Sequence, residues 1–183
     1  LLRHLLVRHS RSTDEMMVVI FATEAAIPEV EELIEIFAEK YPQVKCFQWI
    51  INRQLSDSVQ ADEIELLLGR DFIYDTLAGF RYRLWFDTFF QTNPVQAEKL
   101  VELALEMAEP KKDEKMIDLF CGVGTFSLPF AEKVTELAGI EIVDTSIQSA
   151  RRNAKDNGID NTNFYTSDAR RGLAKVIEEF GVP

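Results

Sequence analysis

Short apolar stretches separated by polar turns dominate the first part of the chain. Residues 2–9 and 16–22 are rich in Val, Leu and Ile, and the polar segment 10–14 joins them, so they predict a β-hairpin. Two further strands are expected near 44–51 and 63–68. With a helix between the two pairs of strands, this region predicts a small α+β unit of the ββαββ type.

The helix of this unit is indicated by apolar residues that recur every three to four positions. Pro28 suits the start of the helix and Pro42 its end. The apolar stripe consists of Ile27, Val30, Ile34, Phe37 and Tyr41.

A second helix is marked by its capping residues. The aromatic-rich segment 80–90 is expected to be extended. Asn93 then suits an N-cap, with Pro94 at the first helical position and Gln96 three residues after the cap. The helix should stop before Pro110. Its apolar face consists of Ala97, Leu100, Val101, Ala104, Leu105 and Ala108.

Strands and helices alternate in the remainder of the chain. Strands are expected at 116–120, 137–142 and 162–166. Helices are expected at 125–133, at 145–157 and from about 170. This βαβαβα order is typical of the first half of a Rossmann-like, doubly wound parallel sheet, so the predicted fold class is α/β.

We expect a domain boundary after residue 86. Residues 1–86 would form the small α+β domain, and residues 87–183 the N-terminal half of the Rossmann-like domain. Three parallel strands make only about half of such a sheet. The chain is therefore expected to be a fragment of a longer protein.

Composition narrows the class of protein. A hydrophobic share of 46% can form ordinary cores, and no apolar run approaches the roughly 20 residues of a membrane span. Cys46 and Cys121 belong to no CxxC pair, so we expect free thiols, no metal site and a cytoplasmic location. The net charge of −11 argues against this chain gripping a phosphate backbone alone. Were the substrate RNA, another segment should supply basic surface.

Acidic residues and glycines mark the ends of the predicted parallel strands. Asp118 ends the first strand, and Gly122 and Gly124 occupy the turn into the next helix, where backbone N–H groups can approach a ligand. Glu141 ends the second strand and Asp168 lies just beyond the third. Strand ends of such a sheet line one crevice. There Glu141 can accept hydrogen bonds from ribose hydroxyls and Asp168 from an adenine amino group, which describes an adenosine-shaped site.

Two cofactor classes compete for this pattern. A dinucleotide fingerprint is nearly matched by Gly122-x-Gly124-x-x-Ser127, with Glu141 at the offset of a ribose partner. Against it, Ser127 replaces the third glycine, and Asp118 would bring negative charge beside a pyrophosphate. The positively charged methionine end of S-adenosylmethionine suits Asp118 better. A dinucleotide-dependent oxidoreductase stays an alternative.

Two motifs carry a family resemblance. FFQTNP at residues 89–94, followed by DLFCGVGT at 118–125, resembles the RNA uracil-5-methyltransferases, which make 5-methyluridine in 23S ribosomal RNA or transfer RNA. The resemblance implies a methyltransferase sheet that depends on S-adenosyl-L-methionine. The side chains that it implies touch this cofactor are Gln91, Phe120, Thr125, Glu141 and Asp168, and Gly122 is expected beside them.

Most of these side chains also have a structural interpretation. Gln91 can brace its loop, and Phe120 can pack under the sheet. Glu141 can be a solvated strand end, and Asp168 can cap the last helix.

The resemblance also implies a mechanism. Similar enzymes add a cysteine thiolate to carbon 6 of uracil, and carbon 5 of the resulting enolate attacks the sulfonium methyl. In that family the cysteine of the glycine turn, here Cys121, belongs to the cofactor loop, and the nucleophile and the base lie downstream. No catalytic residue is therefore assigned in this chain, which should bind the cofactor weakly or not at all and should not methylate RNA alone.

The implied substrate is RNA, with ribosomal RNA preferred over transfer RNA on overall likeness. A third class of function, a non-catalytic RNA- or protein-binding module, would follow if the natural gene ended at Pro183.

Overall fold

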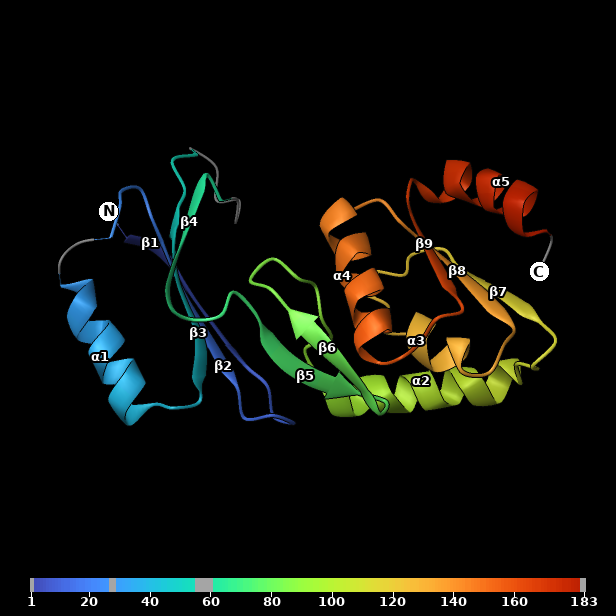
Figure 1. Ribbon diagram of the computed structural model, residues 1–183, viewed down its shortest axis with the longest axis horizontal. Coiled ribbons are helices and arrows are strands. Elements are labelled where there is room, and N and C mark those ends of the chain that lie inside the picture. The colour runs from blue at the N-terminus through green and yellow to red at the C-terminus, as the bar shows by residue number, and fades with distance from the viewer. Residues whose placement is uncertain (1, 27–28, 55–60, 182–183) are drawn as a thin grey trace. The chain divides into compact units, whose positions relative to one another are not determined.

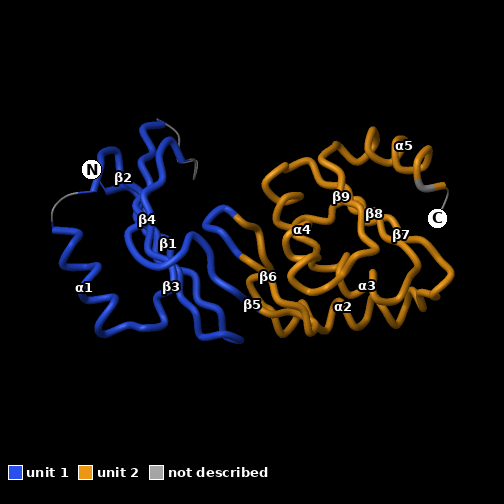
Figure 2. Tube along the Cα trace, in the orientation of Figure 1, with its two compact units in different colours: residues 1–75, 84–87 blue, residues 76–83, 88–183 orange. Residues whose placement is uncertain are grey.

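The computed structural model describes residues 2–26, 29–54 and 61–181 (Figure 1). The chain divides into two compact units: residues 1–75 with 84–87, and residues 76–83 with 88–183 (Figure 2). No helix formed by the described residues is long and apolar enough to cross a membrane.

A short hairpin is shared between the two units. It consists of β5 (Ile73–Leu77) and β6 (Phe80–Leu84). Residues 76–83 belong to the second unit, whereas 84–87 belong to the first. The chain therefore passes between the units more than once, in place of the single boundary expected after residue 86. Strand β5 was not predicted, and β6 covers only the first part of the segment expected to be extended. Two separate folding domains, 1–86 and 87–183, stay a prediction.

The first unit contains a four-stranded sheet in the order β1-β2-β3-β4. Its strands are β1 (Leu2–His9), β2 (Met16–Ala22), β3 (Val44–Ile51) and β4 (Glu63–Gly69). Strands β1 and β2 form the predicted antiparallel hairpin, β2 and β3 are parallel, and β3 and β4 are antiparallel. The helix between β2 and β3 is α1 (Val30–Lys40), which confirms the ββαββ order.

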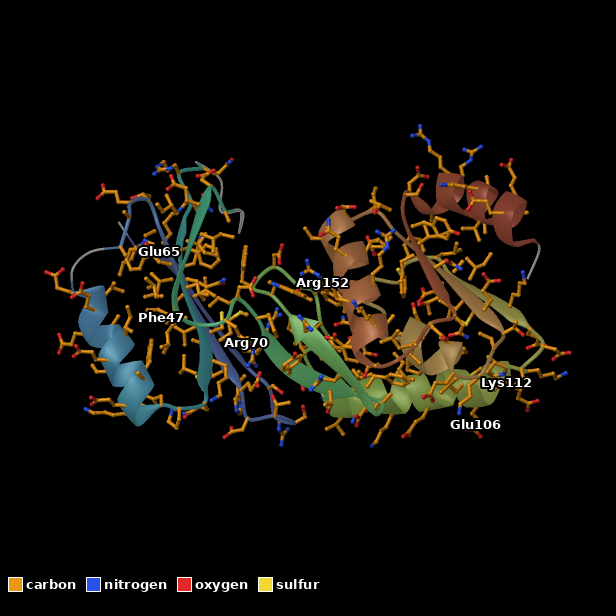
Figure 3. The ribbon with its side chains drawn as sticks, viewed as in Figure 1. Phe47, Glu65, Arg70, Glu106, Lys112 and Arg152 are labelled. Carbon is orange, nitrogen blue, oxygen red and sulfur yellow. The ribbon has the colours of Figure 1, made fainter. Side chains whose placement is uncertain are left out.

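The core of the first unit lies between α1 and one face of this sheet. Phe47, which Figure 3 labels on β3, is fully buried, and its ring meets that of Phe37 edge to face at a centroid distance of 4.9 Å. Val30 and Ile34 belong to the same cluster. The predicted stripe is thus confirmed for the residues that pack here, whereas Ile27 and Pro28 lie outside the described residues.

In the second unit, α2 (Pro94–Ala108) begins as its capping residues predict. The Asn93 side chain accepts a hydrogen bond from the Gln96 backbone N–H, with Pro94 at the first helical position. Val101 is buried, but Leu100 is 52% exposed, so the buried face of the helix is narrower than its apolar stripe.

The second unit also contains a three-stranded parallel sheet in the order β7-β8-β9. Its strands are β7 (Lys115–Asp118), β8 (Glu136–Glu141) and β9 (Thr162–Thr166). The helices that follow them are α3 (Ser127–Ala131), α4 (Asp144–Asp156) and α5 (Ala169–Phe180). The βαβαβα order is confirmed, although β7 and α3 are shorter than predicted because residues 119–126 form the turn between them.

Helices cover both faces of the parallel sheet (Figure 1). Phe130 and Val134, in and just after α3, pack with Leu137 of β8 on one face. Val176 of α5 packs with Ile140 of β8 on the other face. This arrangement holds the carboxyl ends of the three strands in fixed register at one edge of the sheet.

Candidate functional site

The site begins where β7 ends. The Ser127 hydroxyl donates to Asp118 Oδ2 at 2.7 Å, and the Phe120 N–H donates to Oδ1 at 3.4 Å. Burial raises the pKa of the Asp118 carboxyl, these two hydrogen bonds lower it, and the negative charge of Glu141 raises it again. Asp118 therefore lies in a place where an added positive charge would favour its ionised form.

The turn after β7 depends on glycine for its backbone angles. Gly122 has φ of 52° and Gly124 has φ of 93°, a region that L side chains rarely adopt. A Cβ atom at Gly122 would meet nothing within 4 Å, so its backbone angle, not crowding, calls for glycine there. The Gly124 N–H donates to the Cys121 carbonyl at 2.8 Å, which closes the turn.

Glu141 joins the ends of two strands through its carboxylate. Oε2 accepts a hydrogen bond from the Gly122 N–H at 3.3 Å, which links the end of β8 to the turn after β7. Oε1 accepts from the N–H groups of Ile142 at 2.8 Å and Val143 at 3.0 Å. The structure thus brings Gly122 and Glu141 together through a hydrogen-bonded, partly exposed carboxylate.

Asp168 lies beside Glu141 at the same edge of the sheet. The Ser167 N–H donates to the Glu141 carbonyl at 2.9 Å, which holds the end of β9 against the end of β8. The Asp168 side chain accepts from the Arg171 N–H at 3.1 Å and pairs with the Arg171 guanidinium at 3.6 Å. It is therefore the N-cap of α5, as its structural interpretation anticipated.

Phe120 is 79% exposed and does not pack under the sheet. Together with Asp118 and Leu119, it lines a cavity of about 630 Å³ that also touches α2 and α3. Ile142, which follows Glu141, is likewise an exposed apolar side chain. Apolar surface therefore accompanies the acidic groups at this edge.

Gln91 and Thr125 are two further predicted side chains, and both are half-buried. Gln91 is half-buried on the segment before α2, and among the described residues no hydrogen bond joins its side chain to the other predicted ones. Its neighbour Phe90 packs against Tyr82 at a ring distance of 5.5 Å. Thr125 is half-buried in the turn, and its carbonyl oxygen lies 3.5 Å from the Tyr82 hydroxyl.

The sequence analysis assigned no chemistry to Asn153. Asn153 is fully buried in α4, and its Nδ2 donates to the Val123 carbonyl in the glycine turn at 3.1 Å. Its Oδ1 accepts from the Arg83 N–H at 3.0 Å. An asparagine within a helix gives no sequence signal of such contacts, because they join distant parts of the chain.

Both cysteines are free and buried. Burial raises the pKa of the Cys121 thiol, and the negative charges of Asp118 and Glu141 raise it further. Burial likewise raises the pKa of Cys46 to about 12, assisted by Asp71 and opposed by Arg70. Neither thiol is in an environment that favours the thiolate.

The fold and the edge just described define a class of protein, the Rossmann-like methyltransferases. The structure is similar to the crystal structure of Pyrococcus abyssi tRNA (uracil-54, C5)-methyltransferase in complex with S-adenosyl-L-homocysteine, with a TM-score of 0.74 and 30% sequence identity. The match covers 91% of this chain and 39% of that one. The predicted α/β fold class is confirmed.

The family model described as tRNA (uracil-5-)-methyltransferase matches residues 48–176, so the chain belongs to this family. An uncharacterized RNA methyltransferase of Oceanobacillus iheyensis is 35% identical over 97% of the chain, and one of Listeria monocytogenes is 36% identical over 92%. The chain spans 39% and 37% of the lengths of these relatives.

Proposed function

We propose that this chain forms the S-adenosyl-L-methionine-binding part of an enzyme that methylates carbon 5 of uracil in RNA. The observation that carries the proposal is the Glu141 carboxylate, held at the carboxyl end of β8 and bonded to the N–H of Gly122. Family membership supports the reaction, and the ligand of the Pyrococcus abyssi relative supports the cofactor.

The donors and acceptors at the edge fit an adenosine. A carboxylate offers about four lone-pair positions, and backbone N–H groups occupy three of those of Glu141. Binding both ribose hydroxyls therefore requires at least one of these bonds to open, and the 3.3 Å bond to Gly122 is the longest. The exposed ring of Phe120 supplies an apolar surface for a flat base.

Asp118 fits the positively charged end of the same cofactor. Its half-buried carboxyl has a raised pKa, so part of the cost of ionising it is removed when a cation lies beside it. When bound, S-adenosyl-L-methionine supplies the electrophilic methyl group. The contribution of this chain is to bind and orient it.

The nucleophile and the general base belong, in this proposal, to another segment of a longer protein. Cys46 and Cys121 are both buried with raised pKa values, which makes them poor nucleophiles. Unpaired thiols suit a reducing compartment such as the cytoplasm. With a net charge of −11, this chain also leaves much of the RNA contact to other segments.

The RNA substrate is proposed as a class. The preference for 23S ribosomal RNA rests on overall sequence likeness alone, whereas the family model and the Pyrococcus abyssi relative are both named for transfer RNA. A methylation assay of the whole protein should therefore offer both RNAs in parallel.

The first test is isothermal titration of S-adenosylhomocysteine into the chain and into Glu141→Ala. Glu136→Ala is the matched control, because Glu136 opens the same strand at its other end and pairs with Lys115 at 3.3 Å. We expect the affinity to fall at least tenfold, about 1.4 kcal/mol, in Glu141→Ala and to stay within about twofold in Glu136→Ala.

A nicotinamide dinucleotide is titrated as the competing ligand. Saturable binding of the dinucleotide, abolished in Glu141→Ala, would favour the oxidoreductase and overturn the proposal. Equal loss in both variants would mean that Glu141 has no special role in binding. If neither ligand binds, the same two variants are compared in the full-length protein, which supplies the remainder of the site.

A further inference from the structure

Two side chains that are not among the proposed cofactor-binding residues, those of Asn153 and Tyr82, contact backbone carbonyls of the glycine turn after β7. The Val123 carbonyl accepts from Asn153 Nδ2 at 3.1 Å. The carbonyl oxygens of Gly124 and Thr125 each lie 3.5 Å from the Tyr82 hydroxyl. Asn153 and Tyr82 are both 0% exposed, so these contacts form without competition from water.

Asn153 also ties the turn to β6. Its Oδ1 accepts from the Arg83 N–H at 3.0 Å, and its Nδ2 donates to Val123. One partner is a donor and the other an acceptor, so the two together define the orientation of the amide. A substitution that removes either atom therefore removes one defined bond.

Two more side chains, at and just after the C-terminal end of α4, form hydrogen bonds with β6. Asn157 bonds both the N–H and the carbonyl of one β6 residue, as a neighbouring strand would. Asn157 Oδ1 accepts from the Arg81 N–H at 2.9 Å, and its Nδ2 donates to the Arg81 carbonyl at 2.7 Å. Asp156 binds the Arg83 guanidinium through two bonds of 2.6 and 3.0 Å. Of these three side chains at the end of α4, Asn153 is the one that bonds to the turn.

A planar peptide links the Val123 carbonyl to the hydrogen bond that closes the turn, in which the Gly124 N–H donates to the Cys121 carbonyl at 2.8 Å. The C=O of Val123 and the N–H of Gly124 belong to one peptide group and point in opposite directions. The bond from Asn153 to the Val123 oxygen and the bond from the Gly124 N–H to Cys121 therefore hold the two ends of one peptide group. Gly124, with φ of 93°, would otherwise have more conformational freedom than any other residue type.

We propose that Asn153 is a positioning residue for the cofactor turn, which it holds in its binding geometry before any ligand arrives. The ligand-binding part of this inference rests on the proposed function, whereas the ordering of the turn does not. A preset turn loses less conformational entropy on binding, so affinity should depend on the bond from Asn153 Nδ2 to Val123.

The test compares Asn153→Asp with Asn157→Asp. Asn153→Asp keeps the acceptor for the Arg83 N–H but replaces the donor to Val123 with a second oxygen. Asn157→Asp likewise loses an amide donor to backbone carbonyls, those of Arg81 and Asn153, each at 2.7 Å, and its side chain has no bond to the turn. Two quantities are measured: amide hydrogen exchange at residues 122–125 relative to β9, and the dissociation constant of S-adenosylhomocysteine.

In Asn153→Asp we expect exchange in the turn to rise at least tenfold with β9 unchanged, and affinity to fall about tenfold. In Asn157→Asp both quantities should stay within about twofold of the wild type. Equal effects in the two variants would overturn the proposal, since a general loss of stability moves both. If the full-length protein bound no S-adenosylhomocysteine while the turn still responded to Asn153→Asp, the proposed function would fail and the positioning role would stand.

A measurement on the wild-type chain covers the case in which Asn153→Asp does not fold. Hydrogen exchange of the side-chain amide protons of Asn153 is followed by NMR. The side-chain amide of Gln148 on the same helix is the exposed comparison, because its Nε2 donates to Asp144 at the surface. We expect one Asn153 proton to be protected as strongly as the turn backbone, since it is bonded to the Val123 carbonyl. Exchange as fast as that of Gln148 would overturn the proposal.

Discussion

The two larger sheets of this molecule differ in strand direction, and the difference explains where the polar side chains gather. In the first unit β1 and β4 run opposite to β2 and β3, so the carboxyl ends of the strands lie at both edges of the sheet. In the second unit all three strands are parallel, and Asp118, Glu141 and Asp168 lie at or just beyond one edge. Only the parallel sheet concentrates several strand ends, with their free backbone groups, in one place.

The comparison also separates two uses of glycine. Gly69 in the first unit lies where the backbone of a neighbouring strand comes close, whereas Gly122 in the second unit faces open space. Crowding of this kind serves packing, and an open turn serves the approach of a ligand. Substitutions that act on one unit alone therefore test whether the two differ as described.

The largest effect is expected from Gly69→Ala. Its Cβ would lie 2.2 Å from the Lys45 carbonyl oxygen, a backbone atom, and its φ is 77°. We expect a loss of roughly 3 kcal/mol in the free energy of unfolding, from strain and overpacking together. Urea denaturation followed by tryptophan fluorescence measures it, because Trp49 and Trp85 both belong to the first unit.

Gly158→Ala is the control for Gly69→Ala, since Gly158 also has a positive φ, of 70°, but has nothing within 4 Å of an added Cβ. Because Gly158 lies in the second unit, both variants are also followed by far-UV circular dichroism during urea unfolding. It should lose only the strain, about 1–2 kcal/mol. Equal losses at the two glycines would mean that the approach of Lys45 has no energetic cost.

A smaller effect in the second unit is expected from Gly139→Ala. The added Cβ would lie 2.5 and 2.7 Å from two Phe164 ring carbons and 3.0 Å from Cys121 Sγ. Overpacking of this kind costs about 1–3 kcal/mol, which far-UV circular dichroism during urea unfolding measures. If residues 1–86 and 87–183 are separate folding domains, tryptophan fluorescence should not register the change. A fluorescence transition that moves equally would indicate one cooperative unit.

Asp168→Ala should cost about 1 kcal/mol, because the N-cap bond to the Arg171 N–H is lost. Asp168→Asn keeps a capping oxygen and should cost only a few tenths of a kcal/mol. Thermal unfolding of the two variants separates capping from ligand binding. If Asp168→Asn were as unstable as Asp168→Ala, the charge on Asp168 and not its cap would be the source of stability.

The smallest effect is a change in pH dependence in Asp118→Asn. Burial raises the pKa of Asp118, so the folded state holds its proton more tightly than the unfolded chain does. The stability that this contributes is present below the ordinary aspartate pKa and is lost as pH rises through the raised value. Relative to the wild type, Asp118→Asn should therefore gain stability from about pH 4 upward. Parallel pH profiles for the two proteins would contradict the raised pKa of Asp118.

Much of the second unit could be predicted because its signals are local. The helix start is predicted from a segment of four residues, Asn93 to Gln96. The structure contains the expected capping bond, from the Gln96 N–H to the Asn93 side chain. The alternation of strands and helices likewise follows from periodicity within each segment. Strand β5 was missed because Asp75 and Thr76 interrupt its apolar pattern, and it is a strand by virtue of pairing with β6.

The residue types at the strand ends, and their order along the chain, can be read from the amino-acid sequence, because each is set by its own short segment. The contacts that give those residues their surroundings cannot. Glu141 reaches Gly122 across 19 positions, and Asn153 reaches Val123 across 30 and Arg83 across 70. No local periodicity encodes which side of a helix meets which turn, since that depends on how strands and helices pack together in three dimensions.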